Sequence, residues 1–269
     1  MNISVKNKFG FAIDRGGTFT DIYAQCFDGR QISLKLLSED PANYTDAPTE
    51  GIRRILENET GSAIPRGAKI DSSLIEWIRM GTTVATNALL ERKGTPIAVV
   101  ITTGFRDLLR IGNQSRPNLF DLKMDIPGVL FDDVIEVDER VVVAQDLCQL
   151  QSTCESAISE FTGEKLEIWK RLDVEQLKRE LERVFKTGIR SLAVILLHSY
   201  MFPEHEREIE KIALEMGFEN VSLSSTVMPM IRAVSRGFTA CADAYLTPII
   251  QRYIHGFMSG FTDGLKVEF

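Results

Sequence analysis

The sequence is poor in the residues that build metal centres and disulfide frameworks. It has four cysteines, none in a Cys-x-x-Cys pair, and only three histidines among 269 residues. Zinc sites need Cys or His ligands at short spacing, so we expect none here and expect the cysteines to be reduced thiols. No stretch reaches the roughly 18 consecutive apolar residues of a membrane span, and residues 1–8 lack the apolar core of a signal peptide. We therefore predict a cytosolic protein with no membrane partner.

Basic residues are too few and too scattered for a nucleic-acid surface. The chain carries 31 Lys and Arg against 38 Asp and Glu, which gives a formal net charge of −7. Binding to a nucleic-acid backbone needs clustered Lys and Arg, so we predict no nucleic-acid partner. A small phosphorylated ligand remains compatible with this charge, because backbone N–H groups and a bound cation can neutralise it locally.

Strand-like and helix-like segments alternate along much of the chain. Apolar runs bounded by turn residues predict strands over residues 9–14, 19–25, 31–37, 97–101, 134–143, 190–197 and 221–223. Helical spacing and capping residues predict helices over 46–60, 82–93, 105–110, 173–187, 203–216 and 240–257. Pro248 should kink the last helix or mark a boundary. This order is typical of an α/β protein with an antiparallel N-terminal hairpin and parallel strands after it.

Three stretches lack a regular pattern. Residues 61–81 look irregular, and residues 111–129, with two prolines and two glycines, predict a long functional or surface loop. Residues 145–171 are polar and read as an insertion or linker.

The most informative segment is the predicted hairpin at residues 11–21. A strand brings Asp14 to a turn that has no side chain at Gly16 and Gly17, so backbone N–H groups can approach phosphate oxygens, with φ > 0 if the turn needs it. Thr18 and Thr20 can add hydroxyl donors. Asp14 would hold a hydrated Mg²⁺ that bridges to the phosphates, because a carboxylate repels phosphate directly.

An ordinary hairpin turn chosen for its geometry is the simpler interpretation of two adjacent glycines. The complete pattern of apolar strand, Asp, Gly-Gly-Thr and Thr-Asp is more specific than that pair alone. A P-loop would need Gly-Lys followed by Ser or Thr at the start of a helix, and neither this nor a dinucleotide fingerprint occurs. We therefore favour nucleotide binding.

Residues 14–21 resemble the first phosphate motif of the sugar-kinase, actin and Hsp70-like ATPases, and more narrowly that of the hydantoinase A/oxoprolinase family. Further segments resemble the ATP-hydrolysing 5-oxoprolinases of this family: residues 36–41, 46–56, 79–94, 104–109 and 239–248. The resemblance covers most of the chain and weakens around residues 145–171. It implies the first half of an actin-like ATPase fold, with a family N-terminal domain over residues 1–217 and the start of the next domain over residues 218–269.

The family resemblance also implies a function. Such enzymes open the lactam ring of 5-oxo-L-proline to give L-glutamate, coupled to ATP hydrolysis, in glutathione metabolism. ATP and Mg²⁺ are the implied cofactors, with a monovalent cation such as K⁺ as an option, and the full-length enzyme is expected to be a homodimer. In this scheme the nucleotide-binding residues are Asp14, Arg15, Gly16, Gly17, Thr18 and Thr20, and the metal ligands are Asp14 and Asp21. The residues that catalyse ring opening stay unassigned.

Other candidate residues have competing interpretations. Gly81, Thr82 and Thr83 precede a predicted helix and could face an anion at its N-terminus, although Thr82 could simply be an N-cap. Basic and amide side chains near the long loop could hold a substrate carboxylate or be solvated surface groups. They are Arg106, Arg110, Asn113 and Arg116. His198 and Cys241 are expected to be structural rather than catalytic.

One departure from the family pattern limits these expectations. ATPases of this superfamily close the nucleotide between two similar halves, and no second Asp-x-Gly-Gly-Thr segment occurs before Phe269. We therefore expect a truncated product, fragment or incomplete gene model that has half an ATP site and no lactam-opening activity on its own. The alternatives are a hydantoinase-like or acetone-carboxylase-like ATPase component, and a non-catalytic piece.

Overall fold

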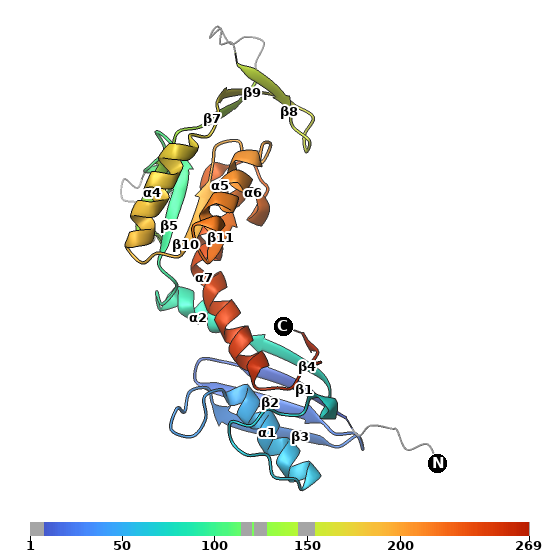
Figure 1. Cartoon of the computed structure of the whole chain (residues 1–269). Coiled ribbons are helices and arrows are strands. Elements are labelled where there is room, and N and C mark those ends of the chain that lie inside the picture. Colours follow the sequence, from blue (N-terminus) through green and yellow to red (C-terminus); the bar gives the residue numbers. More distant parts are fainter. Residues whose placement is uncertain (1–7, 114–119, 121–127, 145–153, 269) are drawn as a thin grey trace. The chain divides into compact units, whose positions relative to one another are not determined.

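The computed structural model describes residues 8–113, 120, 128–144 and 154–268, and the chain forms two compact units (Figure 1). Unit 1 comprises Met1–Lys93 and Ile249–Phe269, and unit 2 comprises Gly94–Pro248. The division at residue 248 falls at Pro248, inside the long helix α7 (Ala233–Ser259), where the sequence predicts a kink or boundary. The predicted boundary after residue 217 separates two family domains and not two compact units of the structure, and it stays a prediction.

Unit 1 is built on a five-stranded sheet with the order β12-β4-β1-β2-β3. Strands β1 (Phe9–Arg15), β2 (Phe19–Gln25) and β3 (Gln31–Leu37) form the predicted antiparallel meander, which confirms that expectation. Strand β4 (Ile75–Thr82) lies parallel to β1, and the short β12 (Val267–Glu268) lies parallel to β4. The expectation of an irregular stretch up to residue 81 is therefore wrong for β4, which follows a 3₁₀ turn at Ser72–Leu74.

One face of this sheet is covered by helix α1 (Ala47–Thr60). Asp46 caps the helix by accepting a hydrogen bond from the Thr49 N–H, and Gly61 ends it at φ 65°. Ile52, Ile55 and Leu56 face the sheet and are almost fully buried. The same core receives Tyr253 and Phe257 from the C-terminal part of α7. The buried apolar residues of β1 and β2 point to this face: Phe9, Phe11, Ile13, Ile22 and Ala24.

The opposite face of the same sheet is more exposed and carries charged and aromatic side chains. Along β2, buried and exposed residues alternate strictly, as the period of two in a strand requires. Asp21 and Tyr23 thus lie on the exposed face, while Thr20 and Ile22 lie on the buried one. This alternation decides which predicted site residues can meet a ligand on the exposed face.

Unit 2 is built on a parallel sheet with the order β11-β10-β5-β6. The strands are β5 (Ile97–Thr102), β6 (Asp133–Val137), β10 (Ser191–Ile195) and β11 (Asn220–Leu223). Helices α4 (Val174–Lys186) and α5 (Glu204–Glu215) pack their apolar residues into the core of this sheet. Asp173 caps α4 by accepting from the Gln176 N–H, as the sequence predicts. The parallel α/β arrangement is confirmed.

A second, three-stranded antiparallel sheet with the order β7-β9-β8 completes unit 2. It comprises β7 (Arg140–Val143), β8 (Glu155–Ile158) and β9 (Lys165–Lys170), so residues 155–170 are not simply a linker. The predicted strand over residues 134–143 is divided at Asp138 and Glu139 between the two sheets of unit 2. Residues 145–153 and most of the predicted 111–129 loop lie outside the described residues.

The remaining helices are short, apart from α7. They are α2 (Val84–Leu90), α3 (Leu108–Ile111) and α6 (Ser224–Val227). Helix α7 is longer than the predicted residues 240–257. None of the helices that the structure describes combines the length and the apolar character needed to cross a bilayer.

Candidate phosphate-binding site on unit 1

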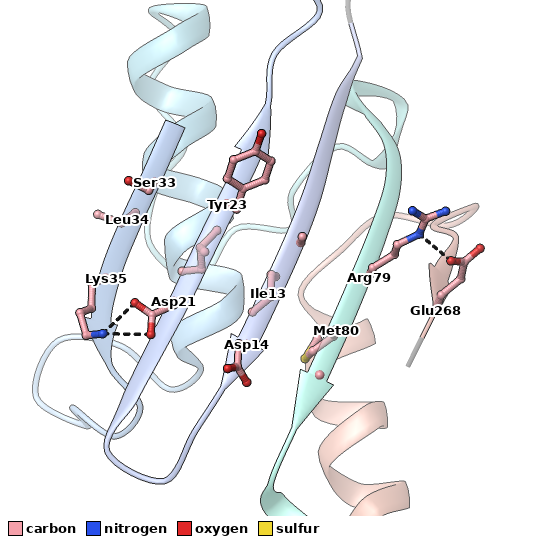
Figure 2. A pocket seen from close by; sticks show the side chains of 13 residues that line it. Ile13, Asp14, Asp21, Tyr23, Ser33, Leu34, Lys35, Arg79, Met80 and Glu268 are labelled. Carbon is pink, nitrogen blue, oxygen red and sulfur yellow. Dashed lines mark hydrogen bonds and ion pairs between the residues drawn. The ribbon is translucent and has the colours of Figure 1, made fainter. Parts of the chain in front are cut away.

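A hollow of about 840 Å³ lies on the exposed face of the unit 1 sheet (Figure 2). Charged side chains from five strands line it: Asp14 from β1, Asp21 from β2, Lys35 from β3, Arg79 from β4 and Glu268 from β12. The sheet register sets Asp14 opposite Asp21 on one side and opposite Gly81 on the other. The hollow therefore brings together Asp14 and Asp21, the two predicted metal ligands, with Gly81, a predicted nucleotide-binding residue.

The Asp14 carboxylate is exposed and uncommitted. It forms no hydrogen bond or ion pair with any residue in the described part of the chain. A Cβ atom at Gly81 would lie 3.9 Å from Asp14 Oδ1, so the missing side chain leaves room beside the carboxylate. An ion or water molecule can approach Asp14 from that side.

The Asp21 carboxylate is already engaged. Lys35 Nζ donates to both of its oxygens, at 2.8 and 3.0 Å, and both side chains are more than half exposed. Figure 2 shows this pair next to Asp14 on the neighbouring strand. No group of three or more metal-ligating side chains comes together among the described residues. Mg²⁺ commonly binds one or two carboxylates and takes its other oxygens from phosphate and water, so the donor set fits such an ion.

The turn between β1 and β2 presents unused backbone donors. Its first N–H, that of Gly16, donates to the Phe19 carbonyl at 3.0 Å and closes the turn. The N–H groups of Gly17 and Thr18 have no acceptor within the described ranges. Both residues are exposed. Two free amides and, within a few residues along the chain, an unpaired carboxylate are groups that can bind a metal-bridged phosphate.

The turn needs glycine at positions 16 and 17 because neighbouring atoms lie too close for a side chain, and not because the backbone has an unusual φ angle. Neither Gly16 nor Gly17 has positive φ. A Cβ at Gly17 would lie 2.9 Å from Nδ2 of Asn87, and one at Gly16 would lie 3.0 Å from the Phe19 carbonyl oxygen. The side-chain amide of Asn87 therefore lies directly beside the turn, held by a 3.2 Å hydrogen bond to Thr83 Oγ1.

Two predicted nucleotide-binding residues point away from the hollow. The Arg15 guanidinium lies over the Tyr253 ring, 4.8 Å from its centroid, on the side of the sheet that carries the core. Burial raises the pKa of Tyr253. Thr20 is fully buried, and its hydroxyl lies 3.0 Å from Ser38 Oγ. Direct phosphate contacts by Arg15 and Thr20 stay predictions, and these positions do not favour them.

The segment Gly81–Thr83 is hydrogen-bonded to the last residue of β1, just before the β1–β2 turn. Thr83 N–H donates to the Arg15 carbonyl at 3.2 Å, and Thr82 Oγ1 accepts from Val84 N–H at 3.3 Å. Thr83 occupies the N-cap position of α2, and its side chain makes no capping hydrogen bond. Thr82 is thus not the N-cap, and both threonines are exposed beside the turn.

The predicted substrate-binding residues lie in unit 2. Arg106 donates to the Val134 carbonyl at 3.3 Å, and the Arg110 guanidinium lies 5.4 Å from the Phe131 ring centroid. Asn113 is exposed after α3, and Arg116 lies outside the described residues. A shared carboxylate site for these residues stays a prediction.

His198 and Cys241 have structural surroundings. His198 has φ 58°, and its Nδ1 lies 2.7 Å from the Val141 carbonyl oxygen. Cys241 is 2 % exposed, and burial raises the pKa of its thiol to about 12. A thiol with so high a pKa is protonated at neutral pH and is a poor nucleophile. This agrees with the expectation that Cys241 has a packing role.

Sequence reasoning missed two residues that shape the turn, Ser38 and Asn87. Both belong to segments that carry the family resemblance, at residues 36–41 and 79–94. That resemblance was the only signal for them, because their contacts with the turn depend on the folded sheet and on α2.

The sheets and helices of the two units define a mixed α/β protein. The structure resembles ATP-dependent caprolactamase from Pseudomonas jessenii, with a TM-score of 0.69 and 21 % identity over 96 % of this chain and 35 % of that one. It also resembles nucleotide-free acetone carboxylase, with a TM-score of 0.65 and 19 % identity over 98 % of this chain and 36 % of that one. The predicted fold class is confirmed at this level.

The chain belongs to the hydantoinase/oxoprolinase family, whose N-terminal region matches residues 10–217. It is 56 % identical over 268 residues to 5-oxoprolinase 1 of Arabidopsis thaliana, covering 98 % of this chain and 21 % of that protein. It is 49 % identical to the 5-oxoprolinase of Dictyostelium discoideum, covering 97 % of this chain and 21 % of that protein. The chain therefore spans about a fifth of the length of these relatives.

Proposed function

We propose that this chain supplies the phosphate-binding part of an ATP-dependent lactam-opening enzyme. The proposed reaction converts 5-oxo-L-proline to L-glutamate with hydrolysis of ATP, as a step of glutathione metabolism. The observation that carries the proposal is that one hairpin presents two unused amides, those of Gly17 and Thr18, and the unpaired carboxylate of Asp14.

The electrostatics of the turn suit a metal-chelated phosphate better than a bare anion. Asp14 would repel a phosphate that came alone, whereas a bound Mg²⁺ would supply the positive charge that brings carboxylate and phosphate together. Asp14 would be the primary ligand, since Lys35 already neutralises Asp21. The Gly17 and Thr18 amides would then donate to the phosphate oxygens.

ATP is the proposed cosubstrate because phosphorylation can activate a lactam carbonyl. The amide carbonyl is a poor electrophile, so direct attack by water is slow. If the carbonyl oxygen attacks the γ-phosphorus, ADP leaves and the activated carbon can accept water. Breaking the C–N bond, with protonation of the ring nitrogen, then leaves an acyl phosphate, and a second water molecule hydrolyses it to the open amino acid and inorganic phosphate. The turn's part in this scheme is to align the phosphates and neutralise charge.

The names of the relatives support the substrate class. Proteins named 5-oxoprolinase align with nearly the whole chain at 43–56 % identity. Because the chain spans about a fifth of those proteins, we predict no lactam-opening turnover by the 269-residue chain alone.

The phosphate-binding proposal is tested by titrating the 269-residue chain with Mg·ATP in a calorimeter. Asp14→Asn should weaken binding roughly tenfold or more, since one interaction with a charged group is worth about 1.5–3 kcal/mol. Asp263→Asn is the matched control, because it removes an equal charge from an exposed aspartate of the same unit. Equal affinities for the two variants, or no binding by the unaltered chain, would contradict the proposal.

The substrate proposal needs the remainder of a relative. The corresponding region of Arabidopsis 5-oxoprolinase 1 can be replaced by this chain, and ATP hydrolysis measured with and without 5-oxo-L-proline. We expect hydrolysis that depends on 5-oxo-L-proline. Stimulation by a hydantoin or a ketone instead would assign the region to another reaction of the family.

A further inference from the structure

Ser38, the residue after β3, holds the glycine turn from behind. It is 4 % exposed, and its hydroxyl donates to the Gly16 carbonyl at 2.7 Å. Its backbone N–H donates to the Thr18 carbonyl at 2.9 Å. Since its one hydroxyl proton is used on Gly16, the contact with Thr20 must have Thr20 as the donor. Ser38 therefore contacts the residues on both sides of Gly17.

These contacts fix the direction of the Gly17 amide. In a planar trans peptide the carbonyl and the following N–H point in opposite directions. The peptide that carries the Gly16 carbonyl also carries the Gly17 N–H. Because Ser38 pulls that carbonyl toward the buried side, the Gly17 N–H is turned away from Ser38 and has no acceptor among the residues described.

Without Ser38 this peptide would have little to hold it. Gly17 is exposed, and glycine has the widest conformational freedom of any residue. Asn87 limits the space on one side of Gly17 but makes no hydrogen bond to the Gly16–Gly17 peptide. The hydroxyl of Ser38 is the side-chain group that selects one orientation of the peptide.

We infer that Ser38 is a positioning residue for phosphate binding: it preorganises the Gly16–Gly17 peptide so that the Gly17 N–H faces the ligand. This inference rests on the proposed function for the identity of the ligand. The orientation of the peptide itself can be measured without any ligand.

The test compares Ser38→Ala with Ser72→Ala in the 269-residue chain. Ser72 is a matched control because it is also buried in unit 1 and its hydroxyl also donates to a backbone carbonyl, that of Thr262, remote in sequence from the turn. Ser38→Cys is a second variant that keeps the shape of the side chain with a weaker donor. The readouts are ¹⁵N relaxation of the Gly17 amide without ligand, and the affinity for Mg·ATP.

Ser38→Ala should lower the order parameter of Gly17 from about 0.85 to below about 0.6, with Ser38→Cys between the two and Ser72→Ala unchanged. Affinity for Mg·ATP should fall about three- to tenfold in Ser38→Ala only, the range expected for one hydrogen bond. An unchanged Gly17 order parameter in Ser38→Ala would overturn the inference, whatever the affinity. A loss of Gly17 order in a chain that binds no Mg·ATP would support the positioning role and overturn the proposed function.

Discussion

Replacing Gly51 with alanine would place a methyl group between helix α1 and the sheet that carries the hollow. The new Cβ would lie 2.0 Å from Ile22 Cδ1, 3.1 Å from Ile22 Cγ1 and 3.5 Å from Leu36 Cδ1. Real Cβ atoms do not approach other atoms to 2.0 Å, so the helix or Ile22 must move. Overpacking of this kind costs about 1–3 kcal/mol.

The helix itself would gain from the same substitution. Alanine is more favourable than glycine in a helix interior by about 1 kcal/mol, so the net loss for Gly51→Ala is expected to be about 0–2 kcal/mol. Ile22→Val removes the clashing Cδ1 and costs about 0.5–1.5 kcal/mol alone. In the double variant the clash is largely gone and the helix gain remains. We expect the double variant to lose about 1–2 kcal/mol less unfolding free energy than the sum of the losses in the two single variants.

Urea unfolding of unit 1 measures this coupling. The chain has two tryptophans, Trp77 in unit 1 and Trp169 in unit 2, so a Trp169→Phe background leaves Trp77 fluorescence as the reporter for unit 1. Strict additivity of Gly51→Ala and Ile22→Val, within about 0.5 kcal/mol, would refute the packing of α1 on β2 described here.

Two further predictions concern buried carboxylates. Hydrogen bonds from Arg53, and then from Arg54, outweigh burial and hold the pKa of Glu50 at about 2, below its ordinary 4.5. The ionised form is therefore the stabilised one. Its contribution, up to about 3 kcal/mol, is present above pH 4.5 and is lost as the pH falls toward 2. Acid titration of unit 1 stability should flatten in Glu50→Gln, and an unchanged acid slope would contradict this. In unit 2, Glu206 is fully buried. One carboxylate oxygen accepts hydrogen bonds from the Leu196 N–H and the Ser224 hydroxyl, and the other accepts hydrogen bonds from the N–H and the hydroxyl of Ser225. Glu206→Gln should destabilise unit 2 by about 3–5 kcal/mol in a Trp77→Phe background, because an amide NH₂ replaces one acceptor and Arg236 loses its charge partner. The exposed Glu208→Gln is the control, and equal stability of the two variants would count against the buried network.

The hairpin was predictable because its signals are local. The run from Phe11 to Asp21 contains two alternating strands and a short turn, and the observed β1 and β2 match the expected residues to within one position. Strands β5 and β10 of unit 2 were predictable for a similar reason, since each is a short run of almost continuous apolar residues. In these segments the pattern along the chain determines the structure.

Strand β4 was not predictable in the same way. Its partner β1 lies more than 60 residues earlier in the chain, and its burial pattern is irregular, with exposed Glu76 and Arg79 among apolar neighbours. Only the completed sheet shows why this stretch is extended. The same is true of β12, whose two residues pair with β4.

The orientation of the site residues was partly predictable. Successive residues in a strand face opposite sides, so Asp14 and Arg15 cannot both face one ligand, and neither can Thr20 and Asp21. The structure places Asp14 and Asp21 on the exposed face and Thr20 on the buried one. The role of Ser38 was beyond sequence reasoning, because it depends on β3 folding back beside the turn.

The most direct test of the central claim follows the backbone amides of the 269-residue chain by ¹H–¹⁵N NMR while Mg·ATP is added. If the turn holds the phosphates, the Gly17 and Thr18 resonances should show the largest shifts, and these shifts should disappear in Asp14→Asn or when EDTA removes Mg²⁺. Shifts confined to other amides, with Gly17 and Thr18 unmoved, would contradict the account.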